Sequence, residues 1–201
     1  TAFDGDDLIK TKDVLANGDA DAVVCLDVNG SVRRIAAQNE FISIKPTYGM
    51  VSRYGTIPVV CSGESVSVLA KCSDACSDIL DVISGYDAKD GTSLPDEMRK
   101  TSDGEVKKVL LITSFLDGVS DEVKAKIDAF TNVLAKNGVE VVKEDEEIIK
   151  KSRIAWNILM CAELCNNVSR YDGVKYGYRT ENPESYDELI KKSRSEGFGT
   201  E

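Results

Sequence analysis

Short apolar runs bounded by turn residues alternate along the chain with longer segments in which apolar residues recur every three or four positions. Four short runs, rich in β-branched residues or alternating between apolar and polar, predict strands at 21–26, 41–45, 107–113 and 139–143. The stretch VSRYG at 51–55, which lies between glycines, predicts a loop and the edge of a strand.

Helical periodicity predicts four helices, at 65–84, 121–136, 148–168 and 185–193. The first is an amphipathic pattern followed directly by Gly85, a typical helix stop. We therefore expect one continuous helix from residue 65 to residue 84.

The order strand, helix, strand across 107–143 predicts a βαβ unit, the usual right-handed crossover between parallel strands. Residues 86–106 are charged and contain glycines and a proline, which predicts a long surface connection and an internal sub-boundary. Together these elements predict an α/β fold with a layered mixed β-sheet flanked by helices, in a single domain spanning residues 1–201.

The net charge of −10 and the pI of about 4.7 repel phosphate over most of the surface. If RNA is a partner, we expect another subunit to hold it. The sequence contains no apolar stretch of roughly 20 residues and no secretory signal pattern. We expect a soluble protein of the cytoplasm, or of an organellar matrix in a eukaryote.

The six cysteines include two pairs with i,i+4 spacing, Cys72/Cys76 and Cys161/Cys165, and each pair could form half of a zinc site on a helix. The chain has no histidine and the two pairs lie far apart in the sequence, so packing of these thiols in the core is favoured and no metal site is predicted. The glycine-rich phosphate loops of nucleotide-binding proteins are also absent from the sequence.

The lack of histidine excludes every Ser-His-Asp or Cys-His mechanism within this chain, so that a nucleophile would need another base, most often a lysine. The segment Asp27-Val28-Asn29-Gly30-Ser31 is the one whose local chemistry resembles a nucleophile loop, because a serine follows a flexible Asn-Gly step. Asn-Gly-Ser is also common in ordinary turns, so the residues alone leave both interpretations open.

Five blocks of the sequence form one ordered set. The longest block is KPTYGMVSRYG at 45–55. The others are VISGYD followed by AKD at 82–90, Ala162-Glu163 with Asn167, RYDGVKYGYR at 170–179 and RSEGFG at 194–199. In this order the blocks resemble the amidase-signature family, and within it the A subunits of the glutamyl-tRNA(Gln) amidotransferases.

Counted backwards from Lys45, the segment 27–33 falls on the family string D-T-G-G-S-I-R. The resemblance therefore implies that Ser31 matches the acyl-forming serine and that the backbone N–H groups of Val28, Asn29 and Gly30 form the oxyanion loop. Two departures alter the wall of the implied site. Arg33-Arg34-Ile35 stands where the family has R-Q-P, and Ser62-Gly63-Glu64-Ser65 replaces the family stretch S-x-D-Q-x-G-P.

The family's lysine base and bridging serine would lie well before Ser31, and residues 1–20 contain no such Gly/Ser-rich segment. The resemblance spans nearly the whole chain but only the middle part of a full family member. We therefore expect a truncated, divergent member, not active as an isolated chain, since loss of a catalytic base removes several powers of ten in rate.

The resemblance implies a role in glutamine hydrolysis and ammonia delivery. Amidotransferase subunits B and C would be the partners, glutamine the substrate, ATP would bind only to a partner subunit, and tRNA would be contacted indirectly. The alternative is a non-catalytic amidase-like module that serves in binding or assembly, because fold kinship does not transmit activity when a site is incomplete.

Overall fold

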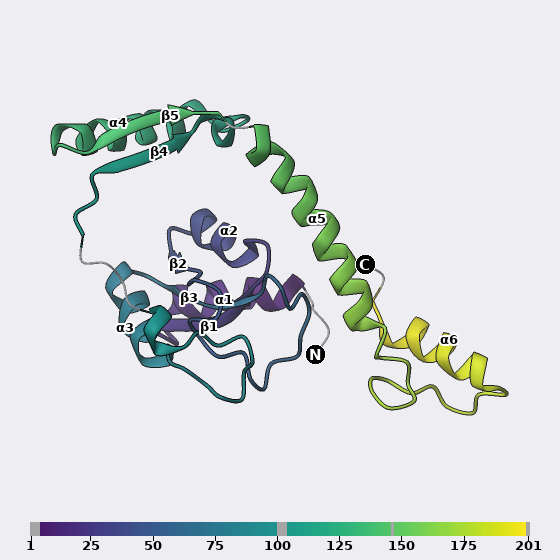
Figure 1. Cartoon of the computed structure of the whole chain (residues 1–201). Coiled ribbons are helices and arrows are strands. Elements are labelled where there is room, and N and C mark those ends of the chain that lie inside the picture. Colours follow the sequence, from purple (N-terminus) through teal and green to yellow (C-terminus); the bar gives the residue numbers. More distant parts are fainter. Residues whose placement is uncertain (1–4, 100–103, 146, 200–201) are drawn as a thin grey trace. The chain divides into compact units, whose positions relative to one another are not determined.

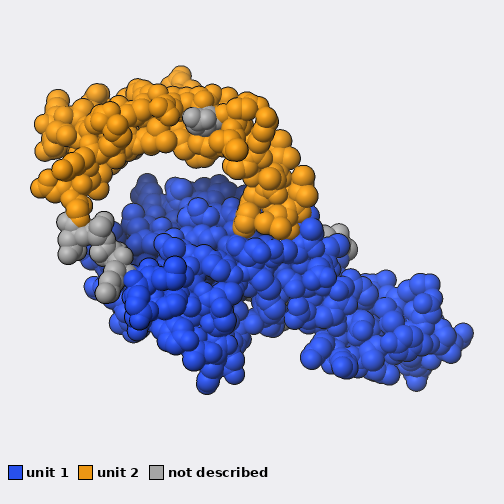
Figure 2. Space-filling model, viewed as in Figure 1, with its two compact units in different colours: residues 1–100, 160–201 blue, residues 101–159 orange. Residues whose placement is uncertain are grey.

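The computed structural model describes residues 5–99, 104–145 and 147–199. It divides into two compact units, one made of residues 1–100 and 160–201 and the other of residues 101–159 (Figure 2). Helices and strands alternate in both units, so the predicted α/β class is confirmed. The assignment of residues 1–201 to a single domain stays a prediction.

The first unit is built on a three-stranded antiparallel sheet (Figure 1). The strands β1 (Ala22–Asp27) and β2 (Ile42–Ile44) lie on either side of β3 (Ser65–Ala70). The last residue of β1, Asp27, is in register with the first residue of β3, Ser65. The predicted strands at 21–26 and 41–45 are thus confirmed, to within one residue at each end.

The predicted helix at 65–84 is wrong over its first part. Residues 65–70 form the central strand β3, and the helix α3 extends only from Ser73 to Ile83. The sequence SVSVLA alternates serine with β-branched or apolar residues, and both of its edges pair with other strands. Long-range pairing therefore overrides an apolar spacing that also fits a helix.

Helices cover both faces of β3, because successive side chains of a strand point to opposite faces. Leu69 packs with Leu15, Val32 and Ala36, which belong to α1 (Gly5–Asn17) and α2 (Ser31–Gln38). The other face, with Val68 and Ala70, packs against Cys76 of α3. The sequence patterns did not predict α1 or α2, and α2 begins at Ser31, where only a turn was expected.

The second unit contains the predicted βαβ arrangement. Strands β4 (Lys108–Ile112) and β5 (Glu140–Glu144) are parallel, with Val109 opposite Val141, and α4 (Asp121–Lys136) lies between them in the chain. The side chain of Ser120 caps α4 by accepting from the backbone N–H of Val123. The parallel and antiparallel strand pairs lie in two separate sheets of the described chain.

The helix α5 extends from Glu147 to Val168, in agreement with its prediction. The helix α6 extends from Tyr186 to Gly197, so it begins as predicted but continues past the predicted end at residue 193. Short 3-10 helices, η1 (Asp96–Arg99) and η2 (Thr113–Leu116), lie in connections. Within the described ranges, no helix is long and apolar enough to cross a membrane.

The cysteines differ in environment, and none of them is in a disulfide. Cys76 is fully buried, as core packing requires, whereas Cys72, Cys161 and Cys165 are exposed, so the predicted core packing is wrong for these three. Burial and the neighbouring Asp27 raise the pKa of the Cys25 thiol to about 11. Burial also raises the pKa of Cys76.

Core packing around β3 can be tested with two valines that face each other across β1 and β3. Val68 is 0% exposed and Val24 is 50% exposed. We expect Val68→Ala to lower the free energy of unfolding by roughly 2 kcal/mol, through lost burial and a residual cavity. Val24→Ala is the matched control and should cost much less. Urea denaturation measures both, and equal losses would contradict the assigned core.

Thiol reactivity provides a second test. At pH 8 the Cys25 thiol, with its pKa near 11, is almost entirely protonated, and thiols react as thiolates. We expect iodoacetamide to modify Cys72, Cys161 and Cys165 first and to leave Cys25 and Cys76 unmodified, as read by peptide mass spectrometry. All six should react in denaturant. Modification of native Cys25 at the rate of Cys161 would refute the assigned environment.

Candidate active site

The candidate nucleophile loop joins the end of β1 to the start of α2. Ser31 is the first residue of α2, and Gly30 before it is left-handed, with φ 93° and ψ 12°. A residue with a side chain adopts this conformation only at a cost, so glycine suits the position. A Cβ at Gly30 would also lie 3.2 Å from the guanidinium of Arg33.

A buried carboxylate holds this loop in shape. Asp27 is 0% exposed, and its two oxygens accept from the backbone N–H of Gly30 at 2.6 Å and from Nε of Arg33 at 2.8 Å. A buried charge must be paired and hydrogen-bonded to be tolerated, and these two bonds meet that need. Because Asp27, Gly30 and Arg33 are bonded together, the position of Ser31 is fixed by its neighbours on both sides.

The predicted oxyanion donors differ in what they do in the structure. The N–H of Gly30 points to Asp27 and is occupied. Across the described residues, neither the N–H of Asn29 nor the hydroxyl of Ser31 has a hydrogen-bond partner. The amides of the first helical turn add the positive end of a helix dipole near Ser31. The loop can thus stabilise a developing negative charge, but it offers Ser31 no base.

Lys45 lies at this loop, and sequence reasoning did not assign it a role. Its Nζ donates to the carbonyl of Val28 at 2.9 Å and to the carbonyl of Gly63 at 2.7 Å. Burial lowers the pKa of Lys45, while Asp27 raises it and Arg33 lowers it. The signal that could have found Lys45 is its place as the first residue of the KPTYG block.

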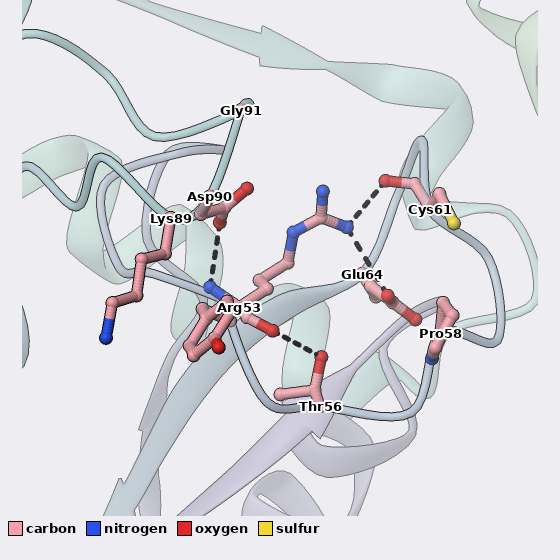
Figure 3. A pocket seen from close by; sticks show the side chains of 9 residues that line it. Arg53, Thr56, Pro58, Cys61, Glu64, Lys89, Asp90 and Gly91 are labelled. Carbon is pink, nitrogen blue, oxygen red and sulfur yellow. Dashed lines mark hydrogen bonds and ion pairs between the residues drawn. The ribbon is translucent and has the colours of Figure 1, made fainter.

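The segment 62–65, predicted to alter the wall of the site, is held by a second buried carboxylate. Glu64 is 1% exposed and accepts from the backbone N–H groups of Val59 at 3.0 Å and Val60 at 3.1 Å. It also pairs with Arg53 at 3.3 Å. Arg53 in turn donates to the carbonyl of Cys61 at 2.6 Å (Figure 3). The sequence did not predict this Arg53–Glu64 pair.

The same segment is tied to the part of α5 that belongs to the first unit. Both the hydroxyl and the backbone N–H of Ser62 donate to the carboxylate of Glu163, and these bonds lower the pKa of Glu163. Asn167 donates to the carbonyl of Val59 at 3.0 Å. Glu163 and Asn167 thus hold the loop that contains residues 59–62. Both residues belong to one of the blocks that resemble the family.

A cleft of about 240 Å³ opens beside Arg53, between the loop at 53–64 and the loop at 89–91 (Figure 3). Lys89 and Asp90 line one side, and Glu64 and Cys61 line another. None of residues 28–31 lines this cleft, so it is separate from the nucleophile loop. Over the ranges that the structure describes, no group of three or more histidine, cysteine or acidic side chains is placed to hold a metal ion.

The structure brings Val28, Asn29, Gly30 and Ser31 together in one loop. Arg33 is bonded to that loop through Asp27, whereas Arg34 is exposed and Ile35 half-buried on α2. The geometry of a serine at a helix N-terminus, preceded by a left-handed glycine, suits nucleophilic attack on a carbonyl carbon followed by stabilisation of an oxyanion.

The fold and this loop define the class of the protein. The family model described as Amidase matches residues 14–201, so the chain belongs to the amidase family. Within that family it is a relative of the amidotransferase A subunits.

Two curated relatives illustrate the match. The chain is 40% identical over 182 residues to the A subunit of the glutamyl-tRNA(Gln) amidotransferase of Ruminiclostridium cellulolyticum, covering 87% of this chain and 37% of that protein. It is 37% identical over 191 residues to the corresponding protein of Thiobacillus denitrificans, covering 90% and 39%. The chain thus spans less than two-fifths of the length of these relatives.

Solved structures agree on the fold. The A subunit of the glutamyl-tRNA(Gln) amidotransferase of Thermotoga maritima superposes with a TM-score of 0.67 at 23% identity, over 79% of this chain and 36% of that one. An allophanate hydrolase of Kluyveromyces lactis gives a TM-score of 0.65 at 20% identity, over 92% and 29%. At these identities the likeness shows the fold alone.

The buried Arg53–Glu64 pair yields a stability prediction. We expect Glu64→Ala to cost about 3–5 kcal/mol, because it leaves a guanidinium that is 10% exposed without its carboxylate. Glu181→Ala, at an exposed position, should change stability by no more than about 0.5 kcal/mol. Chemical denaturation compares the two, and a loss for Glu64→Ala no greater than that of the control would show that the pair does not support the fold.

Proposed function

We propose that this chain carries the nucleophile side of an amidase site, with Ser31 as the acyl-forming serine and the N–H of Asn29 as an oxyanion donor. The observation that carries the proposal is the position of Ser31, which follows left-handed Gly30 at the N-terminus of α2. Two residues before Ser31, the N–H of Asn29 has no partner among the described residues. The family membership supports the same assignment, because Ser31 falls on the family's serine position.

We propose further that these 201 residues do not turn over glutamine by themselves. The hydroxyl of Ser31 has no hydrogen-bond partner within the part of the chain that the structure describes. The lysine that lies at the loop, Lys45, donates to two carbonyls and not to Ser31. A serine hydroxyl without a base remains a weak nucleophile at neutral pH. In this proposal a partner chain supplies the lysine and the bridging serine.

In this proposal the chain acts in glutamine amide hydrolysis within a multi-subunit amidotransferase. The relatives named above are A subunits of amidotransferases named for glutamyl-tRNA(Gln), which supports a place in a multi-subunit amidotransferase. The proposed substrate is glutamine, and the proposed partners are subunits B and C. ATP would then bind to a partner subunit, whereas tRNA would be contacted only indirectly, consistent with the net charge of −10. The proposed location is the cytoplasm.

The second candidate function is a non-catalytic amidase-like module for binding or assembly. One observation favours it, namely that the N–H of Gly30, one of the three predicted donors, is occupied by Asp27. A site with fewer free donors and no base stabilises a tetrahedral intermediate less well. The two candidates differ in a measurable way, since only the first requires the hydroxyl of Ser31.

The test measures ammonia release from glutamine and covalent labelling by a fluorophosphonate, with the chain alone and with subunits B and C of a matching amidotransferase. We expect no release from the chain alone and release with the partners. Ser31→Ala should abolish both release and labelling, because it removes the hydroxyl that forms the acyl bond.

Ser73→Ala is the matched control, since Ser73 is also the first residue of a helix, α3, and is exposed. It should retain both signals. Turnover by the chain alone would overturn the proposed need for other residues. The absence of release and labelling in both settings would overturn the assignment of Ser31 and favour the binding module.

A further inference from the structure

The ammonium of Lys45 connects two loops that are far apart in the sequence. It bonds to the carbonyl of Val28 in the nucleophile loop and to the carbonyl of Gly63 in the loop before β3. Lysine presents its charge as a point with three donors, which allows one ammonium to serve two carbonyls at once. The side chain starts just after β2, so its origin is fixed by the sheet.

The bond to Val28 determines the direction of a different group. The peptide between Val28 and Asn29 is planar and trans, so its C=O and N–H point in opposite directions. When Lys45 holds the carbonyl of Val28, the N–H of Asn29 must point away from the ammonium. That N–H has no partner in the described part of the chain.

Hydrogen bonds hold the other end of the connection in a turn. Gly63 lies in a turn in which its N–H donates to the carbonyl of Val60 at 3.1 Å. The next residue, Glu64, is buried and accepts from the N–H of Val60 at 3.1 Å. Lys45 therefore ties the nucleophile loop to a turn that is itself fixed by a buried charge.

The charges facing the ammonium of Lys45 come from Asp27 and Arg33. These are the two groups that are bonded to one another at the nucleophile loop. Lys45 donates to the carbonyl of Val28, which neither Asp27 nor Arg33 contacts. No bond joins Lys45 to Ser31 in the described structure, which argues against a direct role as the base.

We propose that Lys45 is a positioning residue that fixes the Val28–Asn29 peptide, so that the N–H of Asn29 rather than the carbonyl of Val28 faces the reacting group at Ser31. The role of this peptide in catalysis rests on the proposed function. The orientation of the peptide itself can be measured whether or not the chain is catalytic. Without Lys45 the peptide can rotate, and a carbonyl in place of the N–H would repel an oxyanion.

The test uses the full 201-residue chain with Lys45→Met, Lys45→Arg and, as a control, Lys71→Met at an exposed lysine. Crystal structures give the direction of the Val28 carbonyl, and ¹H–¹⁵N spectra follow the amide of Asn29. We expect the carbonyl to leave its native direction and the Asn29 signal to shift or split in Lys45→Met. Lys45→Arg, which keeps charged donors, should restore the native direction, and Lys71→Met should leave both readouts unchanged.

A native carbonyl direction with an unchanged Asn29 signal in Lys45→Met overturns the inference. If Lys45→Met does not fold, Lys45→Gln, whose amide can donate to one carbonyl, is judged by the same two readouts. Where the parent chain labels with a fluorophosphonate at Ser31, labelling should fall about a hundredfold in Lys45→Met, the scale of losing one oxyanion donor.

The carbonyl direction and the labelling at Ser31 together distinguish a failure of this inference from a failure of the proposed function. A peptide that turns in Lys45→Met, in a chain whose Ser31 never labels, supports the positioning role and contradicts the role of Ser31. Labelling at Ser31 that is unaffected by Lys45→Met, with the carbonyl unmoved, contradicts the positioning role alone.

Discussion

The candidate site depends on the two hydrogen bonds that the buried carboxylate of Asp27 accepts. A carboxylate with no exposure to solvent has to find donors within the protein, and it finds them in the N–H of Gly30 and the guanidinium of Arg33. These two bonds close the turn between β1 and α2. Gly30 is thereby held in a left-handed conformation, and Ser31 becomes the first residue of a helix.

A second buried carboxylate, Glu64, performs the same task in the neighbouring loop. It accepts from two backbone N–H groups and pairs with the guanidinium of Arg53. The loop before β3 is therefore held by a buried carboxylate, as is the loop after β1. Lys45 then joins the two loops through the carbonyls of Val28 and Gly63. Five charged residues without a direct part in the proposed chemistry thus set the geometry in which Ser31 lies, namely Asp27, Arg33, Lys45, Arg53 and Glu64.

Family membership establishes the ancestry of the chain, whereas its activity depends on the chemistry of the site. The amidase match over residues 14–201 and the strand order of the first unit establish ancestry and fold. Activity depends on whether a base reaches Ser31, and the described residues give its hydroxyl no partner. Because a fold can persist after a catalytic group is lost, the proposed function is tied to the local chemistry of this loop and not to kinship alone.

The sequence by itself determined the family resemblance and the elements whose signals are local, including β1, α4, β5 and α6, because periodicity and caps lie within each segment. The sequence also predicted that residues 28–31 form one candidate nucleophile loop. Only the tertiary structure decided that residues 65–70 form a central strand, because pairing on both edges outweighed their helical spacing. The bonds from Lys45 to Val28 and from Arg53 to Glu64 likewise join residues far apart in the chain, and a one-dimensional pattern contains no information on which buried charges meet.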